Sequence, residues 1–204
     1  MAFAVITGDI INSSKEDPKV WLPVLKDALN KIGSSPKEWE IYRGDSFQVL
    51  IKHPMDALRI AIQIKASIKT IKSLDVRMAL GIGSVNHHSS NITESNGSAF
   101  IHSGEKFEVL KKEKLNLAIK SDWADFDRDI NLLIRLALLT MDNWTENAAE
   151  MIKIMFENPN KAQSELGSII GIKQNAVSSR LKRAAYEEIS EMTELYQLKL
   201  EEKL

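Results

Sequence analysis

Strand patterns occur only in the first part of this chain and stop near residue 119. Up to that point, some short segments are apolar or alternate between apolar and polar residues, as in strands. Between them lie segments whose apolar residues have helical spacing. From Asp129 onward every apolar pattern has the spacing of a helix. A chain that changes in this way combines a mixed unit of strands and helices with an all-helical unit. We therefore predict an α+β domain over residues 1–127 and a helical domain over residues 128–204.

The first domain has the predicted order strand, helix, strand, strand, helix, strand, helix, strand. This order is typical of the ferredoxin-like or polymerase-palm fold, in which helices cover one face of an antiparallel sheet. The apolar first strand is expected to end at Gly8 and Asp9, whereas Gly44 and Asp45 are expected to form the turn of a hairpin. The predicted strands cover residues 2–7, 39–51 (as a hairpin), 75–83 and 115–119, and the predicted helices cover residues 21–32, 55–71 and 99–110.

The composition is that of an ordinary folded protein, with 44% hydrophobic and 27% charged residues. Because the formal net charge is only -1, any contact with DNA has to come from a local basic surface. The chain contains no cysteine, which excludes disulfides and thiolate metal sites and agrees with a reducing compartment. We therefore expect a cytoplasmic protein that does not enter a membrane.

A helix-turn-helix pattern extends from about residue 161 to about residue 189. Leu166 and Ile170 give its first helix an apolar face, and Gly167 is small where two helices would cross closely. Gly171 suits a turn that needs a left-handed backbone conformation. The other face of the second helix carries polar and basic side chains, which can reach base edges and phosphates. These predicted DNA-binding residues are Lys173, Gln174, Asn175, Ser178, Ser179, Arg180, Lys182 and Arg183.

The segment over residues 176–184, AVSSRLKRA, resembles the recognition helix of sigma-factor region 4 and related bacterial DNA-binding domains. This resemblance implies a DNA-binding protein and a role in regulating transcription. A helical hairpin of this kind can instead pack against another protein. Because acidic residues follow Ala185, the basic patch is short, and two copies in a homodimer would bind DNA better than one. We expect the two copies to meet through the first domain.

Several short segments of the first 110 residues resemble class III nucleotide cyclase domains. The segments are FAVITGDI at 3–10, YRGDSF at 42–47, DVRMALGIG at 75–83 and GSAFIHSGEKFE at 97–108. The resemblance implies that Asp9 and Asp45 are the metal-binding aspartates. Two converging carboxylates also favour Mg²⁺ on chemical grounds, since this ion prefers oxygen ligands. Alternatively, Asp9 only caps the following helix and Asp45 only serves the hairpin turn.

For a bound nucleotide, the candidate residues are Gly8, Arg43 and Gly44. At the positions where cyclases carry an asparagine and an arginine, this chain has Ile101 and Glu105. Without that arginine, the charge that develops on the phosphoryl group would lack its main stabiliser. We therefore expect no cyclase activity.

The whole chain resembles the SatD-like family of small bacterial proteins. The pattern G-D-I-x-x-S over residues 8–13 and R-G-D-S-F over residues 43–47 carry this resemblance. It implies a cyclase-like half followed by a helix-turn-helix. The leading interpretation is a DNA-binding transcriptional regulator whose degenerate cyclase-like domain senses a ligand or mediates dimerisation. The alternative is a Mg²⁺-dependent enzyme that binds or processes nucleotides.

Overall fold

A five-stranded sheet lies at the centre of the computed structural model, which describes residues 1–87 and 89–204. From edge to edge the strands are β2 (Trp39–Tyr42), β3 (Ser46–Ile51), β1 (Phe3–Ile11), β4 (Asp75–Gly83) and β5 (Leu117–Lys120). Neighbouring strands are antiparallel except for β4 and β5, which are parallel. The expectation of a purely antiparallel sheet is therefore wrong. A helical crossover joins β4 to its neighbour β5, and such a connection makes the two strands parallel.

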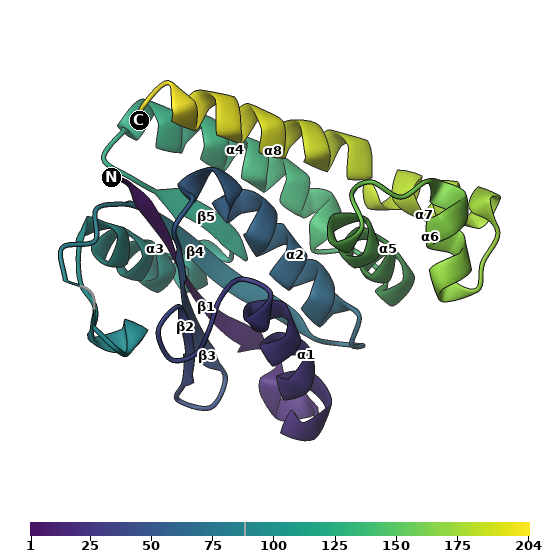
Figure 1. Ribbon diagram of the computed structural model, residues 1–204, viewed down its shortest axis with the longest axis horizontal. Helices are drawn as coiled ribbons and strands as arrows, with labels where there is room; N and C mark the ends of the chain where they lie inside the picture. The colour runs from purple at the N-terminus through teal and green to yellow at the C-terminus, as the bar shows by residue number, and fades with distance from the viewer. Residues whose placement is uncertain (88) are drawn as a thin grey trace.

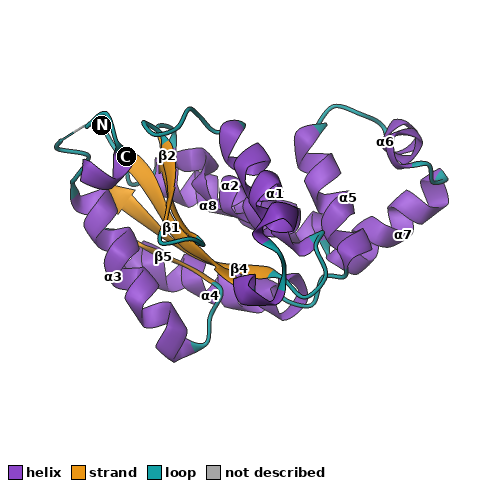
Figure 2. Cartoon of the chain, turned by 90° about the horizontal axis from the view of Figure 1, so that it is seen from below, coloured by secondary structure: helices purple, strands orange, loops and turns teal. Residues whose placement is uncertain are grey.

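Helices cover both faces of this sheet (Figures 1 and 2). Helix α3 (Ser98–Glu113) packs on β4, β1 and β5 from one side. The other face packs against α1 (Pro18–Asn30), α2 (Ala57–Lys69) and α4 (Ala124–Met141). The expectation that helices cover one face only is wrong, because β1 is apolar on both of its faces. Each face therefore has to be removed from water.

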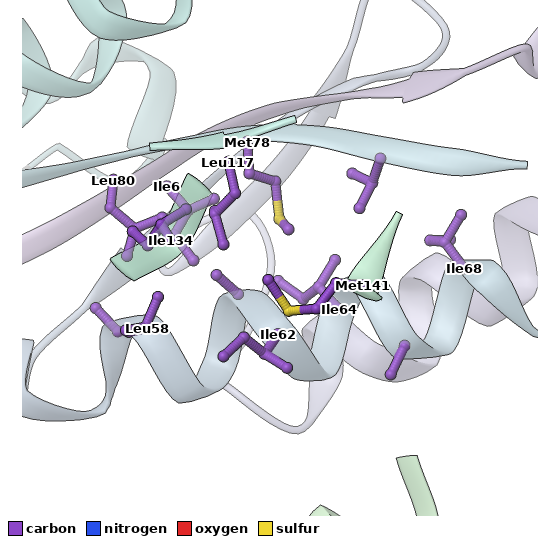
Figure 3. Packing of buried hydrophobic residues seen from close by; sticks show 14 of the residues in the cluster. Ile6, Leu58, Ile62, Ile64, Ile68, Met78, Leu80, Leu117, Ile134 and Met141 are labelled. Carbon is purple, nitrogen blue, oxygen red and sulfur yellow. The ribbon is translucent and has the colours of Figure 1, made fainter. Parts of the chain in front are cut away.

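The larger core lies between the sheet and α2, where side chains from both interdigitate (Figure 3). Leu58 and Ile62 of α2 pack in the same cluster as Ile6 of β1 and Met78 and Leu80 of β4, and all five are fully buried. Such side chains contribute about 1.5–3 kcal/mol each when they leave water. The helix predicted over residues 55–71 is confirmed, and this is its buried side.

Strand β1 is longer than the sequence indicates. It runs from Phe3 to Ile11, so it does not end at Gly8 and Asp9. Asp9 pairs with Ser46 on one side and with Arg77 on the other. Because β3 pairs with β1 as far as Asp9 and β4 does so as far as Ile11, the ladder runs through two residues that are unfavourable in strands when taken alone.

The described residues after β5 form helices, and several of these helices pack against the sheet domain. They form α4 followed by α5 (Glu146–Glu157), α6 (Gln163–Ile170), α7 (Gln174–Ala184) and α8 (Tyr186–Glu201). One apolar cluster includes the sheet together with residues of α4, α5 and α8. The buried Tyr196 of α8 donates a hydrogen bond from its hydroxyl to the carbonyl oxygen of Pro54, 2.7 Å away. The division into domains at residues 127 and 128 stays a prediction. The two predicted domains contact each other through this shared apolar core.

Glu38 is a buried carboxylate that fastens the loop before β2. Its Oε2 accepts hydrogen bonds from the backbone N–H of Ser34 at 3.0 Å and from the Ser34 hydroxyl at 2.5 Å, and its Oε1 lies 3.0 Å from Nζ of Lys52. These donors, with the Ser34 hydroxyl first, lower the pKa of Glu38 from 4.5 to about 2. The folded state therefore prefers the ionised form of Glu38.

We expect Glu38→Gln to lower the free energy of unfolding at pH 7 by on the order of 2 kcal/mol, a value already reduced because Lys52 is exposed. Since the pKa of Glu38 is depressed on folding, its contribution is complete above pH 4.5 and is lost between pH 4.5 and about 2. Urea unfolding at several pH values measures this. Glu108→Gln, an exposed position on α3, is the control. A difference between wild type and Glu38→Gln that is the same at pH 7 and pH 2.5 would contradict the assignment.

Candidate nucleic-acid interface

Helices α5, α6 and α7 pack around a small apolar cluster of their own. Its buried members are Met151 and Ile154 of α5, Leu166 of α6, and Val177 and Leu181 of α7. Helix α7 contacts both α5 and α6. At the right of Figure 1, α6 and α7 lie at the end of the molecule, and α5 lies between them and α2. The segment predicted as a helix-turn-helix therefore has two helices that pack at a turn, supported by α5 as a third.

Gly167 within α6 and Gly171 at its end have the roles that the sequence predicted. Gly171 ends α6 in the left-handed conformation, with φ of 70°. At Gly167 an added Cβ would lie 2.5 Å from the carbonyl oxygen of Ile172, which is closer than real contacts allow. The amide of Ile172 donates to the carbonyl oxygen of Gly167 at 2.9 Å. A side chain at position 167 would therefore force α6 away from the turn.

One long face of α7 is open to solvent. Val177, Leu181 and Ala184 face inward. The predicted DNA-binding residues that are exposed are Lys173, Gln174, Asn175, Ser178, Ser179, Lys182 and Arg183. No acidic residue lies in α7, whereas Glu187 and Glu188 open α8. The structure thus brings seven of the eight predicted side chains onto one exposed surface, which we call the α7 face.

Arg180 differs from the other seven residues. It is only partly exposed, and its Nη1 lies 2.9 Å from Oε2 of Glu150 on α5. This ion pair ties α7 to α5. The sequence gives no sign of this pairing, because the two residues are 30 positions apart.

The first turn of α7 has backbone N–H groups without a side-chain cap. Lys173 occupies the N-cap position, and its ammonium group can only donate hydrogen bonds. The first amides of the helix are therefore open to water or to an anion. Together with the helix dipole, such amides favour a phosphate group at this end of α7.

A second polar cluster lies on the sheet, around Asp9. Its Oδ2 is 3.3 Å from Nη1 of Arg77 and 3.7 Å from Nζ of Lys111, while its Oδ1 is buried and has no hydrogen-bond partner in the described part of the chain. Burial raises the pKa of Asp9, although Arg77 and Lys111 oppose this effect, and Asp45 adds to it. Arg77 was not among the predicted site residues, although a charged residue between apolar ones in β4 was a signal for it.

Asp45 lies near Asp9, as predicted for the hairpin turn. Its Oδ2 accepts a hydrogen bond from the Ser13 hydroxyl at 2.5 Å, and its backbone oxygen accepts one from Ile10 at 3.1 Å. Within residues 1–87 and 89–204, no group of three or more His, Asp or Glu side chains could hold a metal ion. Because Arg77 and Lys111 already balance the charge of Asp9, the pair offers a divalent cation little net negative charge. The Mg²⁺ site stays a prediction.

The remaining residues assigned to a nucleotide site lie on β1 and in the hairpin turn between β2 and β3. Arg43 and Gly44 form the exposed hairpin turn, with φ of 52° and 90°. Gly8 lies within β1, and the ring of Phe47 fills the space next to its Cα. Ile101 is 58% exposed on α3, and Glu105 on the same helix forms an ion pair with Lys120. Nucleotide binding at Gly8, Arg43 and Gly44 also stays a prediction.

Comparison with known proteins gives one family. The SatD family matches this chain over residues 3–189. A search of curated proteins found no match. In the described ranges 1–87 and 89–204, no helix is long and apolar enough to cross a bilayer. Since the family match spans both the sheet and helices α6 and α7, the protein belongs to the SatD family.

Proposed function

We propose that this protein binds double-stranded DNA through the α7 face and acts as a transcriptional regulator. The observation that carries the proposal is an exposed helix with basic and amide side chains, no acidic residue and an uncapped N-terminus. In helix-turn-helix domains the second helix enters the major groove with its N-terminal residues next to the bases. On α7 this assigns base contacts to Gln174, Asn175 and Ser178, and phosphate contacts to Lys182 and Arg183.

The proposal includes a role for the first domain. The strand order β2-β3-β1-β4, with β1 antiparallel to both of its neighbours, is the order of a ferredoxin-like sheet, to which β5 is added at one edge. We take this unit as a palm-like domain that senses a ligand or supports dimerisation. Its resemblance to nucleotide cyclases and that of α7 to sigma-factor domains belong to the same proposal. No contact around Asp9 favours the alternative of a Mg²⁺-dependent enzyme.

Exchange of both basic residues at the end of α7, Lys182→Ala with Arg183→Ala, is expected to weaken DNA binding about tenfold or more at 50 mM salt. The slope of log affinity against log salt should fall by about 1.8, since two phosphate contacts are lost. Fluorescence anisotropy with labelled duplexes of random sequence, at salt concentrations from about 50 to 200 mM, measures both quantities.

The matched control removes two lysines from another surface. Lys19→Ala with Lys26→Ala on α1 changes the net charge by the same amount at exposed positions. This control should retain the wild-type affinity and salt slope to within about twofold. If the wild-type protein shows no binding at 50 mM salt, or if both pairs of substitutions weaken binding equally, the α7 face is not a DNA-binding surface.

A further inference from the structure

The outer surface of α4 and α8 carries exposed leucines. On α4, Leu132, Leu136 and Leu139 are 50%, 57% and 72% exposed, and their spacing of three and four residues places them on one side of the helix. On α8, Leu195 and Leu198 are 39% and 61% exposed. Single exposed leucines are common, whereas a group on one surface indicates a contact with another molecule.

The two helices lie side by side and run in opposite directions (Figure 1). Lys199 of α8 is 3.0 Å from Asp129 of α4, and Lys203 is 2.9 Å from Asp125. In both pairs the residue numbers add up to 328, which fixes the antiparallel register. Leu195 is then level with residue 133, between Leu132 and Leu136 of α4. The five leucines therefore form a single patch, which we call the leucine face.

Charges border the leucine face with opposite sign on its two sides. Asp125 and Asp129 face α8, so helical spacing places Arg128 and Arg135 on the side of α4 that is remote from α8. By the same reasoning, Glu194 and Glu201 lie on the side of α8 that is remote from α4. All four side chains are exposed. In the described ranges Arg135, Glu194 and Glu201 form no ion pair, and Arg128 contacts only its neighbour Asp129.

We infer that the leucine face binds a second copy of this chain, with a two-fold axis parallel to α4 and α8. This axis places α4 of one copy on α8 of the other, so that the basic border meets the acidic border. Residues at the same level of α4 and α8 have numbers that add up to 328, so Arg135 is level with residue 193 and Arg128 with residue 200. Arg135 then faces Glu194 of the second copy, and Arg128 faces Glu201. A perpendicular axis would instead bring arginines against arginines.

The size of the leucine face agrees with a homodimer. Helices of 18 and 16 residues are about 27 and 24 Å long. Side by side they cover roughly 20 Å in width, hence about 500 Å² in projection and more in accessible surface. Stable interfaces use about 600–1,000 Å² on each partner. The sequence favoured a meeting of the two copies through the first domain, whereas this face is formed by α4 and α8.

The same axis has a consequence that rests on the proposed function. Helix α8 starts directly after α7, so α7 lies at one end of the leucine face. A two-fold axis parallel to the helices keeps that end on the same side in both copies. Both α7 faces can then reach one DNA duplex, as two half-sites require. Antiparallel copies around a perpendicular axis would present their α7 faces at opposite ends.

Sedimentation equilibrium of the full chain at 1–100 µM tests the dimer without DNA. We expect a species of twice 23.0 kDa. Leu136→Asp with Leu198→Asp should raise the dimer dissociation constant on the order of 100-fold or more. The far-UV circular dichroism spectrum should stay unchanged, because both side chains are exposed on the single chain. Ile101→Asp is the control, since this residue is equally exposed but lies on α3 across the sheet. It should leave the dimer intact.

Charge reversal tests the axis. Arg135→Glu and Glu194→Arg should each weaken the dimer about threefold to tenfold, and the double substitution should restore it. A monomer at 100 µM, or a dimer that tolerates the leucine substitutions, would overturn the inference. Failure of the double substitution to restore the dimer would overturn the axis. A dimer that behaves as expected but does not bind duplex DNA would overturn only the proposed function, and a monomer that binds DNA would overturn only the inference.

Discussion

Lys65→Ala is expected to lower the free energy of unfolding by about 3–5 kcal/mol, because it removes a fully buried cation from between two half-buried carboxylates. The side chain of Lys65 on α2 is completely buried. Its Nζ lies 2.7 Å from Oδ1 of Asp75 on β4 and 2.7 Å from Oδ1 of Asp142, which caps α4. Lys69 contacts the same two residues, at Oδ2 of Asp75 and at the backbone oxygen of Asp142. One ammonium group therefore joins a helix, the sheet and the end of α4.

Urea unfolding followed by far-UV circular dichroism measures this loss. Lys72→Ala, at an exposed position beyond the end of α2, is the control and should change stability by less than about 0.5 kcal/mol. In the double variant Lys65→Met with Asp142→Asn, Asp75 keeps its ion pair with Lys69 and Asp142 no longer carries a charge, so most of the lost stability should return. A loss below about 1 kcal/mol for Lys65→Ala would mean that water reaches the two carboxylates.

Lys65 also shows what the sequence could have predicted. Helical spacing from Ala61, Ile62 and Ile68 places it on the apolar side of its helix. A lysine at such a position predicts a buried ion pair, because a buried ammonium group needs a partner. The two partners could not be predicted, since Asp142 lies 77 positions away along the chain (142 minus 65) and becomes a neighbour only through packing.

Local patterns predicted β4 and the hairpin of β2 and β3, because alternation and a Gly-Asp turn are properties of a few consecutive residues. The predicted end of β1 was wrong because the length of this strand depends on pairing with distant segments. Gly8 and Asp9 are poor strand residues, and only pairing with both neighbouring strands keeps them in the ladder. The parallel pairing of β5 likewise depends on the path of α3, which no local pattern shows.

In the candidate interface, the residues that set the backbone were predictable and some side-chain partners were not. Gly167 and Gly171 are required by the close helix crossing and the left-handed turn, so the sequence identified both. The exposed side of α7 follows from the helical period. The pairing of Arg180 with Glu150 does not, because α5 has to be placed against α7 before the two charges meet. Long-range ion pairs are the part of the site that the sequence leaves open.

Gly167→Ala is expected to weaken the proposed DNA binding about tenfold or more and to destabilise the packing of α6 against α7 by about 1–3 kcal/mol. The added Cβ would lie 2.5 Å from the carbonyl oxygen of Ile172 and 3.3 Å from Cγ2 of Val177. The first of these is a backbone atom of the turn, which cannot rotate away as a side chain would. The turn has to open, and α7 then loses its position relative to α6.

Gly104→Ala is a closely matched control for this substitution. Gly104 lies inside α3, and outside the backbone of this helix no atom lies within 4 Å of the Cβ that alanine would add. There the substitution should stabilise the protein by about 0.5–1 kcal/mol, as expected for glycine to alanine in a helix. Hydrogen exchange of the Val177 and Leu181 amides, together with anisotropy on labelled duplexes, measures both variants. If Gly167→Ala and Gly104→Ala change stability equally and with the same sign, α6 and α7 tolerate a side chain at their crossing. If Gly167→Ala still binds DNA, binding does not depend on the geometry of this turn.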